Sequence, residues 1–458
     1  MKLLNTPMRS SNNTSIFGVT FLTLGILAAF FVFGWFSVWS VLALVVLVCV
    51  VLFWGDHLWL GALLVPLSVP VGFVATLLVG RSYEYDITGV EIVLLLLSTA
   101  AMYALLWRRV QEGGHSRTEI LLAAYIVLAV ASLFWVQDFA KYLVAVRVAI
   151  YHFLAFFCAR LFLHSPKTRE WMMRTIPIVV IVISVQLLSE LAHLGTIRRI
   201  LMERSFIFTP VGAMAFVTAT IVLLLPLVVV QYYRTTNWSR WIYFSAGVLG
   251  ILAVLGSIGK AALLVMLTSL GYLFYRLNKG RMFFKRVAFA GVVLMVLAGG
   301  GSFTPSLLVE RFANIAGDVS SKFRVEEART AFGVYNEHPV FGVGAGNLKY
   351  HFQRLLNGYS GESNILPLQV AAEFGTVGLV LLGALILAMR DLVHRLDHRV
   401  TGRENRLMLI GFQASLVAAI LHGFLEVTFI GLAYGVLFWL LVGMMDGWRV
   451  PSPRVGEG

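Results

Sequence analysis

Apolar runs of roughly 18 to 25 residues follow one another along the whole chain, separated by short polar connections. Each run is long enough to cross a hydrocarbon core about 30 Å thick at 1.5 Å rise per residue. Stretches such as Ile207 to Val230 are apolar all round, whereas strands of outer-membrane barrels alternate apolar and polar positions. The pattern predicts an all-α, polytopic transmembrane helical bundle of about 12 to 14 spans.

The expected spans lie near residues 16–36, 38–54, 58–80, 88–107, 119–136, 142–163, 175–194, 207–232, 240–257, 260–277, 286–300, 364–389, 406–423 and 427–446. We expect residues 1–458 to form one transmembrane domain, and the first helix to be uncleaved because no small-residue cleavage site follows Lys2 and Arg9.

Composition agrees with this prediction. Of the 458 residues, 59% are hydrophobic and 13% are charged, against about 25% charged in soluble domains, which excludes a soluble fold. Both cysteines, Cys49 and Cys158, fall inside apolar runs with no second cysteine nearby. They are therefore interpreted as core residues and not as a disulfide or metal site.

The formal net charge of +13 is explained by membrane orientation. With a cytoplasmic N-terminus, alternate connections collect most of the basic residues, as the positive-inside rule requires. A nucleic-acid-binding surface is not needed to account for the charge, and no nucleic-acid partner is expected.

One connection on the outer side is unusually long, at roughly 60 residues from Gly301 to Ser363, and long loops are usually functional. Residues Ser321 to Tyr335 place apolar side chains at helical spacing, and Pro339 ends that pattern. We expect this large extracytoplasmic loop, 301–363, to contain a short amphipathic helix against the bundle.

Several cations lie where the orientation rule does not place them. They are Lys141, Arg147, Arg198, Arg199, Arg204 and Lys260. Because a cation inside the membrane usually faces the bundle or a wet cavity, Arg147 is a candidate site residue, with Glu91 or Glu190 as a structural partner. For Lys141, Arg198 and Arg199 we favour snorkelling to the interface.

Arg204 and Lys260 are expected at the outer interface, where either could bind an anion such as a lipid-linked diphosphate. The loop adds Arg324 and the glycine-rich segment His338 to Asn347. This segment lacks the Gly-Lys-Ser/Thr of a phosphate loop. We interpret it as a tight turn into the bundle, with an anion-binding nest of amides as the alternative.

Four segments together resemble the O-antigen ligase and polymerase superfamily of membrane glycosyltransferases. The first is His338-Pro-Val-Phe-Gly-Val-Gly-Ala-Gly-Asn347 followed by Ser363-Asn-Ile-Leu-Pro-Leu-Gln-Val-Ala-Ala-Glu-Phe-Gly-Thr-Val-Gly378. The others are Arg204 to Phe216, Ser257 to Leu264 with Lys260 in place of arginine, and His422-Gly-Phe-Leu-Glu426. They cover roughly the C-terminal 60% of the chain.

The resemblance implies a GT-C-like bundle in the bacterial inner membrane, with its active site on the periplasmic side. The donor would be an undecaprenyl-diphosphate-linked glycan, the acceptor a glycan or lipid A-core hydroxyl, and the surrounding membrane lipid the route of entry. No metal or other cofactor is expected. By resemblance Arg204 and Lys260 would hold the diphosphate, and by position Arg324 and Arg147 would support them.

The family motif has histidine before its asparagine, where this chain has Ser363. Serine is not a base near neutral pH without a partner, so His338, His351 and Glu373 are the candidate catalytic residues, although His351 also fits a surface position. The resemblance leaves polymerase and ligase open. A flippase for lipid-linked oligosaccharide and a non-catalytic scaffold are the alternatives.

Overall fold

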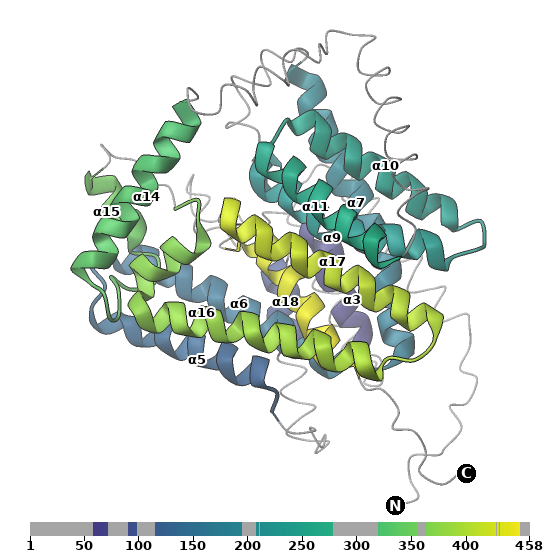
Figure 1. Ribbon diagram of the computed structural model, residues 1–458, viewed down its shortest axis with the longest axis horizontal. Coiled ribbons are helices and arrows are strands. Elements are labelled where there is room, and N and C mark those ends of the chain that lie inside the picture. Colours follow the sequence, from purple (N-terminus) through teal and green to yellow (C-terminus); the bar gives the residue numbers. More distant parts are fainter. Residues whose placement is uncertain are drawn as a thin grey trace, which may run out of the picture.

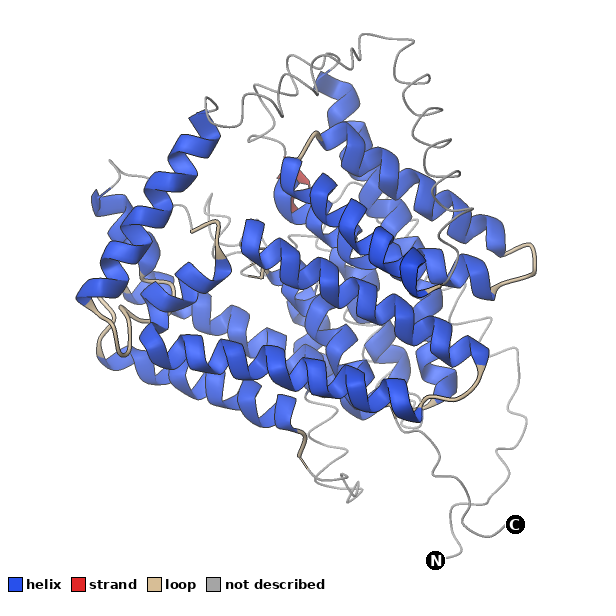
Figure 2. Ribbon diagram, viewed as in Figure 1, coloured by secondary structure: helices blue, strands red, loops and turns tan. Residues whose placement is uncertain are grey.

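The computed structural model describes residues 58–71, 90–98, 115–194, 208–209, 211–277, 319–355, 363–426, 428–429 and 431–448, and within them the chain is almost entirely helical (Figure 2). The helices are α3 (Leu58–Ser68), α5 (Arg117–Ala131), α6 (Phe139–Phe162), α7 (Pro166–Leu194), α9 (Met214–Arg234), α10 (Arg240–Ser257), α11 (Lys260–Arg276), α14 (Val319–Glu337), α15 (Leu348–Leu355), α16 (Leu366–Arg399), α17 (Arg403–Leu425) and α18 (Leu432–Asp446).

Smaller elements complete this part of the chain. Residues 90–98 are helical, and 3-10 turns cover Val69–Val71 (η1) and Ser132–Phe134 (η2). Two short strands, β1 (Phe208–Thr209) and β2 (Gly212–Ala213), pair antiparallel just before α9.

Seven helices among the described residues are long and apolar enough to cross a membrane: α5 with η2, α6, α7, α9, α10, α16 and α17. The chain is thus an all-α, polytopic integral membrane protein, as predicted. The expected span at 240–257 coincides with α10. The expected spans 16–36, 38–54 and 286–300 lie outside the described residues, so the total of 12 to 14 stays a prediction.

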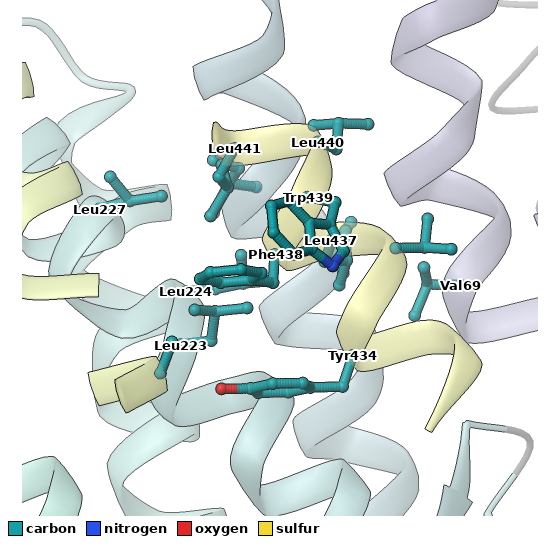
Figure 3. Close-up of a cluster of buried hydrophobic side chains, with 14 of the residues drawn as sticks. Val69, Leu223, Leu224, Leu227, Tyr434, Leu437, Phe438, Trp439, Leu440 and Leu441 are labelled. Atoms are coloured by element: carbon teal, nitrogen blue, oxygen red, sulfur yellow. The ribbon is translucent and has the colours of Figure 1, made fainter. Parts of the chain in front are cut away.

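The core of the bundle is built around α9, which is the most buried of the seven helices. It packs against α7, α10, α17 and α18 (Figure 1). Figure 3 shows Leu223, Leu224 and Leu227 of α9 facing the aromatic and aliphatic side chains of α18, among them Phe438 and Leu441. Because lipid is as apolar as these side chains, close van der Waals packing holds the helices together.

Three glycines let α18 approach α6 closely. A β-carbon at Gly443 would lie 2.2 Å from the carbonyl oxygen of Phe156, and one at Gly447 would lie 2.6 Å from that of Arg160. At Gly435 it would lie 2.0 Å from Nε2 of His152. Small residues at this spacing are a common device for packing membrane helices.

The long outer connection forms a helical layer at one end of the bundle. Its α14 and α15 pack against the first turns of α16, away from α10 and α11 (Figure 1). The predicted helix is confirmed, and α14 ends at Glu337, two residues before Pro339. The predicted apolar face is wrong, because Val325 and Phe332 are exposed while Ala331 and Val334 are buried. A hydrophobic cluster shared by α14, α15 and α16 fixes this layer.

Replacing Gly443 by valine should destabilise the protein, because the contact is with a backbone carbonyl that cannot rotate away. We expect a loss of about 1 to 3 kcal/mol, as in other overpacked cores. Gly383→Ala is the matched control, since nothing lies within 4 Å of the added carbon. Thermal unfolding in detergent measures both, and equal melting temperatures would contradict the packing role of Gly443.

Candidate active site

The glycine-rich segment before α15 is joined to α16 through backbone hydrogen bonds. The helix is interrupted at Gly375, where φ is 63° and ψ is −156°. The amides of Val343 and Gly344 donate to the carbonyls of Ala372 and Glu373 at 2.9 and 2.8 Å. Beyond the interruption, the amide of Thr376 donates to Pro339 at 2.8 Å. We name this contact, between residues 339–344 and 372–377, the loop–helix clasp.

The clasp needs glycine at both sides. A β-carbon at Gly342 would lie 2.3 Å from the carbonyl carbon of Glu373, and one at Gly375 would lie 2.3 Å from that of Val340. Both residues also have positive φ, which favours glycine. The expected tight turn is therefore present. Amides of Gly342, Val343 and Gly344 already donate within the protein, so the anion-nest interpretation of these amides is wrong.

Asn347 extends the clasp to the start of α6. Its side chain is fully buried, and its Oδ1 accepts hydrogen bonds from the amides of Gln137 and Asp138 at 2.9 and 2.8 Å. Asp138 in turn caps α6 by accepting the amide of Lys141 at 3.1 Å. One amide side chain thus sets where α6 begins, and with it the position of Lys141.

A cavity of about 250 Å³ opens beside the clasp. Apolar side chains of α5, α6, α16, α17 and α18 form most of its wall, including Leu122, Val148, Leu382, Phe424 and Trp439. Polar side chains gather where the clasp meets α6. They are Lys141, Lys349, Gln369 and Glu373. Apart from Tyr125 of α5 and His152 of α6, the cavity therefore has an apolar length within the spanning helices, and it has a charged end under α15.

Two separate sets of polar contacts, one at Lys141 and one on α16, hold the charged end. Lys141 donates to Gln353 on α15 and lies 3.5 Å from Asp138. Only 10% of its side chain is exposed, so the expected snorkelling of Lys141 is wrong: a counterion and an amide hold it inside. On α16, Gln369 donates to the carboxylate of Glu373.

Ser363 has a structural role at the start of α16. It is fully buried, its amide donates to Oε1 of Gln369 at 2.9 Å, and its hydroxyl accepts the amide of Ile365 at 3.4 Å. Next to it, Asn364 donates to the carboxylate of Glu327 on α14. The segment that resembles the family motif thus ties α16 to the outer layer.

The described cations among those predicted to bind the diphosphate do not lie together in one site. Arg147 lies 3.3 Å from the buried carboxylate of Glu91, so the structural partner expected for it is present. Arg324 donates to Glu426 at 2.9 Å, linking α14 to the end of α17. Lys260 is the first residue of α11 and does not line the cavity. Arg204 lies outside the described residues.

Of the predicted catalytic residues, Glu373 lines the cavity and the two histidines do not. His338 and His351 are neighbours, with ring centroids 6.4 Å apart. His351 is 8% exposed, so a surface position for it is wrong. Burial, with the positive field of His338, lowers the pKa of His351 below its usual 6.5, and its imidazole is neutral at pH 7.

Sequence reasoning missed Lys349, Gln369 and Glu327. Glu327 had a detectable signal, because it stands four residues before Ala331 and seven before Val334 on the buried face of α14, yet is only 1% exposed. A carboxylate on an apolar helical face indicates a buried partner. Lys349 and Gln369 had no such signal, since their place depends on how α15 and α16 meet. Among the described residues, no three His, Cys, Asp or Glu side chains gather to hold a metal ion.

Residues 245–383 match the model of a protein family described as O-antigen ligase. This match takes in the clasp, the outer helices α14 and α15, and the charged end of the cavity on α16. This part of the chain, under a third of its 458 residues, is thus similar to O-antigen ligases. The resemblance drawn from the motifs is confirmed by this match. A search of curated proteins found no match.

The family match indicates the general class of activity. It supports a membrane enzyme of the O-antigen ligase or polymerase type, acting in polysaccharide biosynthesis on a lipid-linked glycan and an acceptor. Cys158 is buried and free, in agreement with its interpretation as a core residue. Cys49 lies outside the described residues.

Asn347→Ala should destabilise the clasp, because the amides of Gln137 and Asp138 then lose their buried acceptor. A buried donor left without a partner costs about 1 to 3 kcal/mol. The matched control is Asn405→Ala, since Asn405 is exposed and makes one weak bond at 3.4 Å. Chemical unfolding followed by tryptophan fluorescence measures the difference. An unchanged unfolding midpoint for Asn347→Ala would show that Asn347 does not stabilise the clasp.

The lowered pKa of His351 predicts a pH-dependent stability. Below about pH 6.5 the unfolded chain binds a proton at His351 more readily than the folded chain, so the free energy of unfolding falls as pH drops. His351→Gln should reduce the change in melting temperature between pH 7.5 and pH 5.5. An identical pH response in wild type and variant would show that His351 titrates alike in both states.

Proposed function

We propose that this protein is a glycosyltransferase of the O-antigen polymerase or ligase type in the bacterial inner membrane. It transfers a glycan from an undecaprenyl-diphosphate-linked donor to a hydroxyl of an acceptor glycan or lipid A-core, on the periplasmic side and without a metal ion. The observation that carries the proposal is the cavity with an apolar length and a charged end, within a chain whose residues 245–383 are similar to O-antigen ligases.

The shape of the cavity suits a lipid-linked sugar. Side chains of five helices give an apolar wall inside the bundle, where a polyprenyl chain is soluble. Lys141, Lys349 and Gln369 at the charged end are the kinds of groups that bind phosphate oxygens and sugar hydroxyls. The clasp brings these two regions together, because it joins the outer layer to α16 by backbone contacts.

The proposed reaction needs positive charge near the leaving group. As the bond between the anomeric carbon and the diphosphate oxygen breaks, negative charge grows on the diphosphate, and fixed cations stabilise that transition state. We assign this role to Arg204 and Lys260, as the motif resemblance implies. Arg147 and Arg324, which were predicted to support them, are instead paired with Glu91 and Glu426. The sequence predicts Glu373, His351 and His338 as catalytic residues; of these, Glu373 lines the cavity, where its carboxylate can orient the acceptor.

A deletion strain tests the function directly. We expect lipid-linked glycan to accumulate on the outer face of the inner membrane, with loss of long polysaccharide, because export precedes the proposed transfer. Single repeat units would indicate a polymerase, and full-length glycan absent from lipid A would indicate a ligase. Accumulation on the cytoplasmic face would instead support a flippase and would contradict the proposal.

Substitution of the proposed cations tests the site. Arg204→Ala and Lys260→Ala should each lower polymer yield by about tenfold or more, because each removes a charge from the diphosphate. Lys167→Ala, at an exposed position at the start of α7, is the control and should restore the deletion strain fully. Full yield from both variants, at wild-type protein levels, would remove Arg204 and Lys260 from the site.

A further inference from the structure

A buried polar cluster lies at the end of α17, next to the cavity but separate from its charged end. His422 is fully buried, and neither ring nitrogen has a hydrogen-bond partner among the described residues. The ring of Tyr434 on α18 lies 6.4 Å from it by centroid distance. A buried imidazole without a partner is costly, so a function is the expected reason for its presence.

The carboxylate of Glu426 is fixed beside this imidazole. Its Oε2 lies 4.0 Å from Nδ1 of His422, while its Oε1 accepts a hydrogen bond from Arg324 of α14 at 2.9 Å. The amide of Glu426 donates to the carbonyl of His422 at 2.7 Å and holds the turn that follows α17. The guanidinium therefore orients a carboxylate toward one nitrogen of His422 and leaves Nε2 for another group.

Phe429 contacts both the cavity and the cluster. Phe429 lines the cavity and also packs edge-on against Tyr434, with ring centroids 5.4 Å apart. Gly423, the residue after His422, lines the cavity too. A β-carbon at Gly423 would lie 3.2 Å from the Phe429 ring, so there is no room for a larger residue between that ring and α17.

From this arrangement we infer that His422 is the general base for the acceptor hydroxyl, an inference that rests on the proposed glycosyl transfer. The acceptor oxygen bonds to the anomeric carbon, its proton passes to Nε2 of His422, and the bond to the diphosphate breaks with its electron pair leaving on the polyprenyl diphosphate. Phe429 turns aside to admit the hydroxyl. The Glu426 carboxylate stabilises the imidazolium that forms.

In this arrangement Arg324 and Glu426 are positioning residues. Arg324 belongs to the outer helix α14, so the carboxylate is oriented only when α14 is docked on α17. His338 and His351 do not line the cavity. His152 of α6 lines the cavity, but its Nε2 lies against Gly435 of α18, where an added β-carbon would be 2.0 Å away. His422 directly precedes the cavity residue Gly423.

His422→Gln tests the inference, using purified full-length protein in detergent with a lipid-linked glycan donor and its acceptor. We expect the rate of transfer to fall by about a hundredfold or more, the usual contribution of a general base, while donor affinity changes less than about twofold. His394→Gln, at an exposed position on α16, is the matched control and should keep wild-type activity. A His422→Gln protein that is folded and fully active overturns the inference.

Glu426 supplies a second test, which also decides the matter if His422→Gln does not fold. Glu426→Gln should lower kcat by about tenfold with little change in KM, because the imidazolium loses its carboxylate while the substrates still bind. Glu426→Asp should restore part of the rate. A purely structural role would instead move stability and KM together, and unchanged kcat in Glu426→Gln would overturn the inference.

The two proposals fail in different ways. If wild-type protein transfers no glycan from any lipid-linked donor, the proposed function fails and the role of His422 fails with it. If wild type transfers glycan and both His422→Gln and Glu426→Gln do so at the same rate, only the inference on His422 fails.

Discussion

The backbone-to-backbone contact between the glycine-rich segment and the interrupted α16 is the constraint on which the candidate site depends. Hydrogen bonds at 2.8 to 2.9 Å join the backbone of residues 339–344 to the backbone of α16. The two backbones can approach this closely because Gly342 and Gly375 have no side chain. In an uninterrupted helix, the backbone carbonyls accept hydrogen bonds from amides of the same helix. Here the interruption frees carbonyls of α16 for the loop, and the loop gives α15 and Asn347 fixed places.

The spanning helices were predictable because their signal is local. The apolar run at 240–257 became α10 without a shift, and α14 was read from the spacing of apolar residues before Pro339. Hydropathy reports the length and the apolar composition of a segment. The thickness of the membrane sets the length, and its apolar interior sets the composition. A helix boundary differs from the expected one where another interaction sets it. The span expected from 207 begins at Met214 as α9, because the β1–β2 pair precedes it.

The site was predictable only in part, because charge in a sequence does not reveal its partner. Arg147 and Lys141 were interpreted as exceptions to the orientation rule and Arg324 as a cation of the long loop. The structure gives each a carboxylate nearby: Glu91, Asp138 and Glu426. Two of these pairs join residues at least fifty positions apart in sequence. Motif resemblance found the segments that meet in the clasp, but not that their glycines serve main-chain packing or that His422 is buried beside Glu426.

The anchoring of both ends of the segment after Asn347 has a consequence for changes in its length. Asn347 is tied to the start of α6, and Ser363 is tied to Gln369 at the start of α16. A chain held at two fixed points can gain or lose residues between them at little conformational cost. A change of length after α15 would therefore leave the starts of α6 and α16 in place.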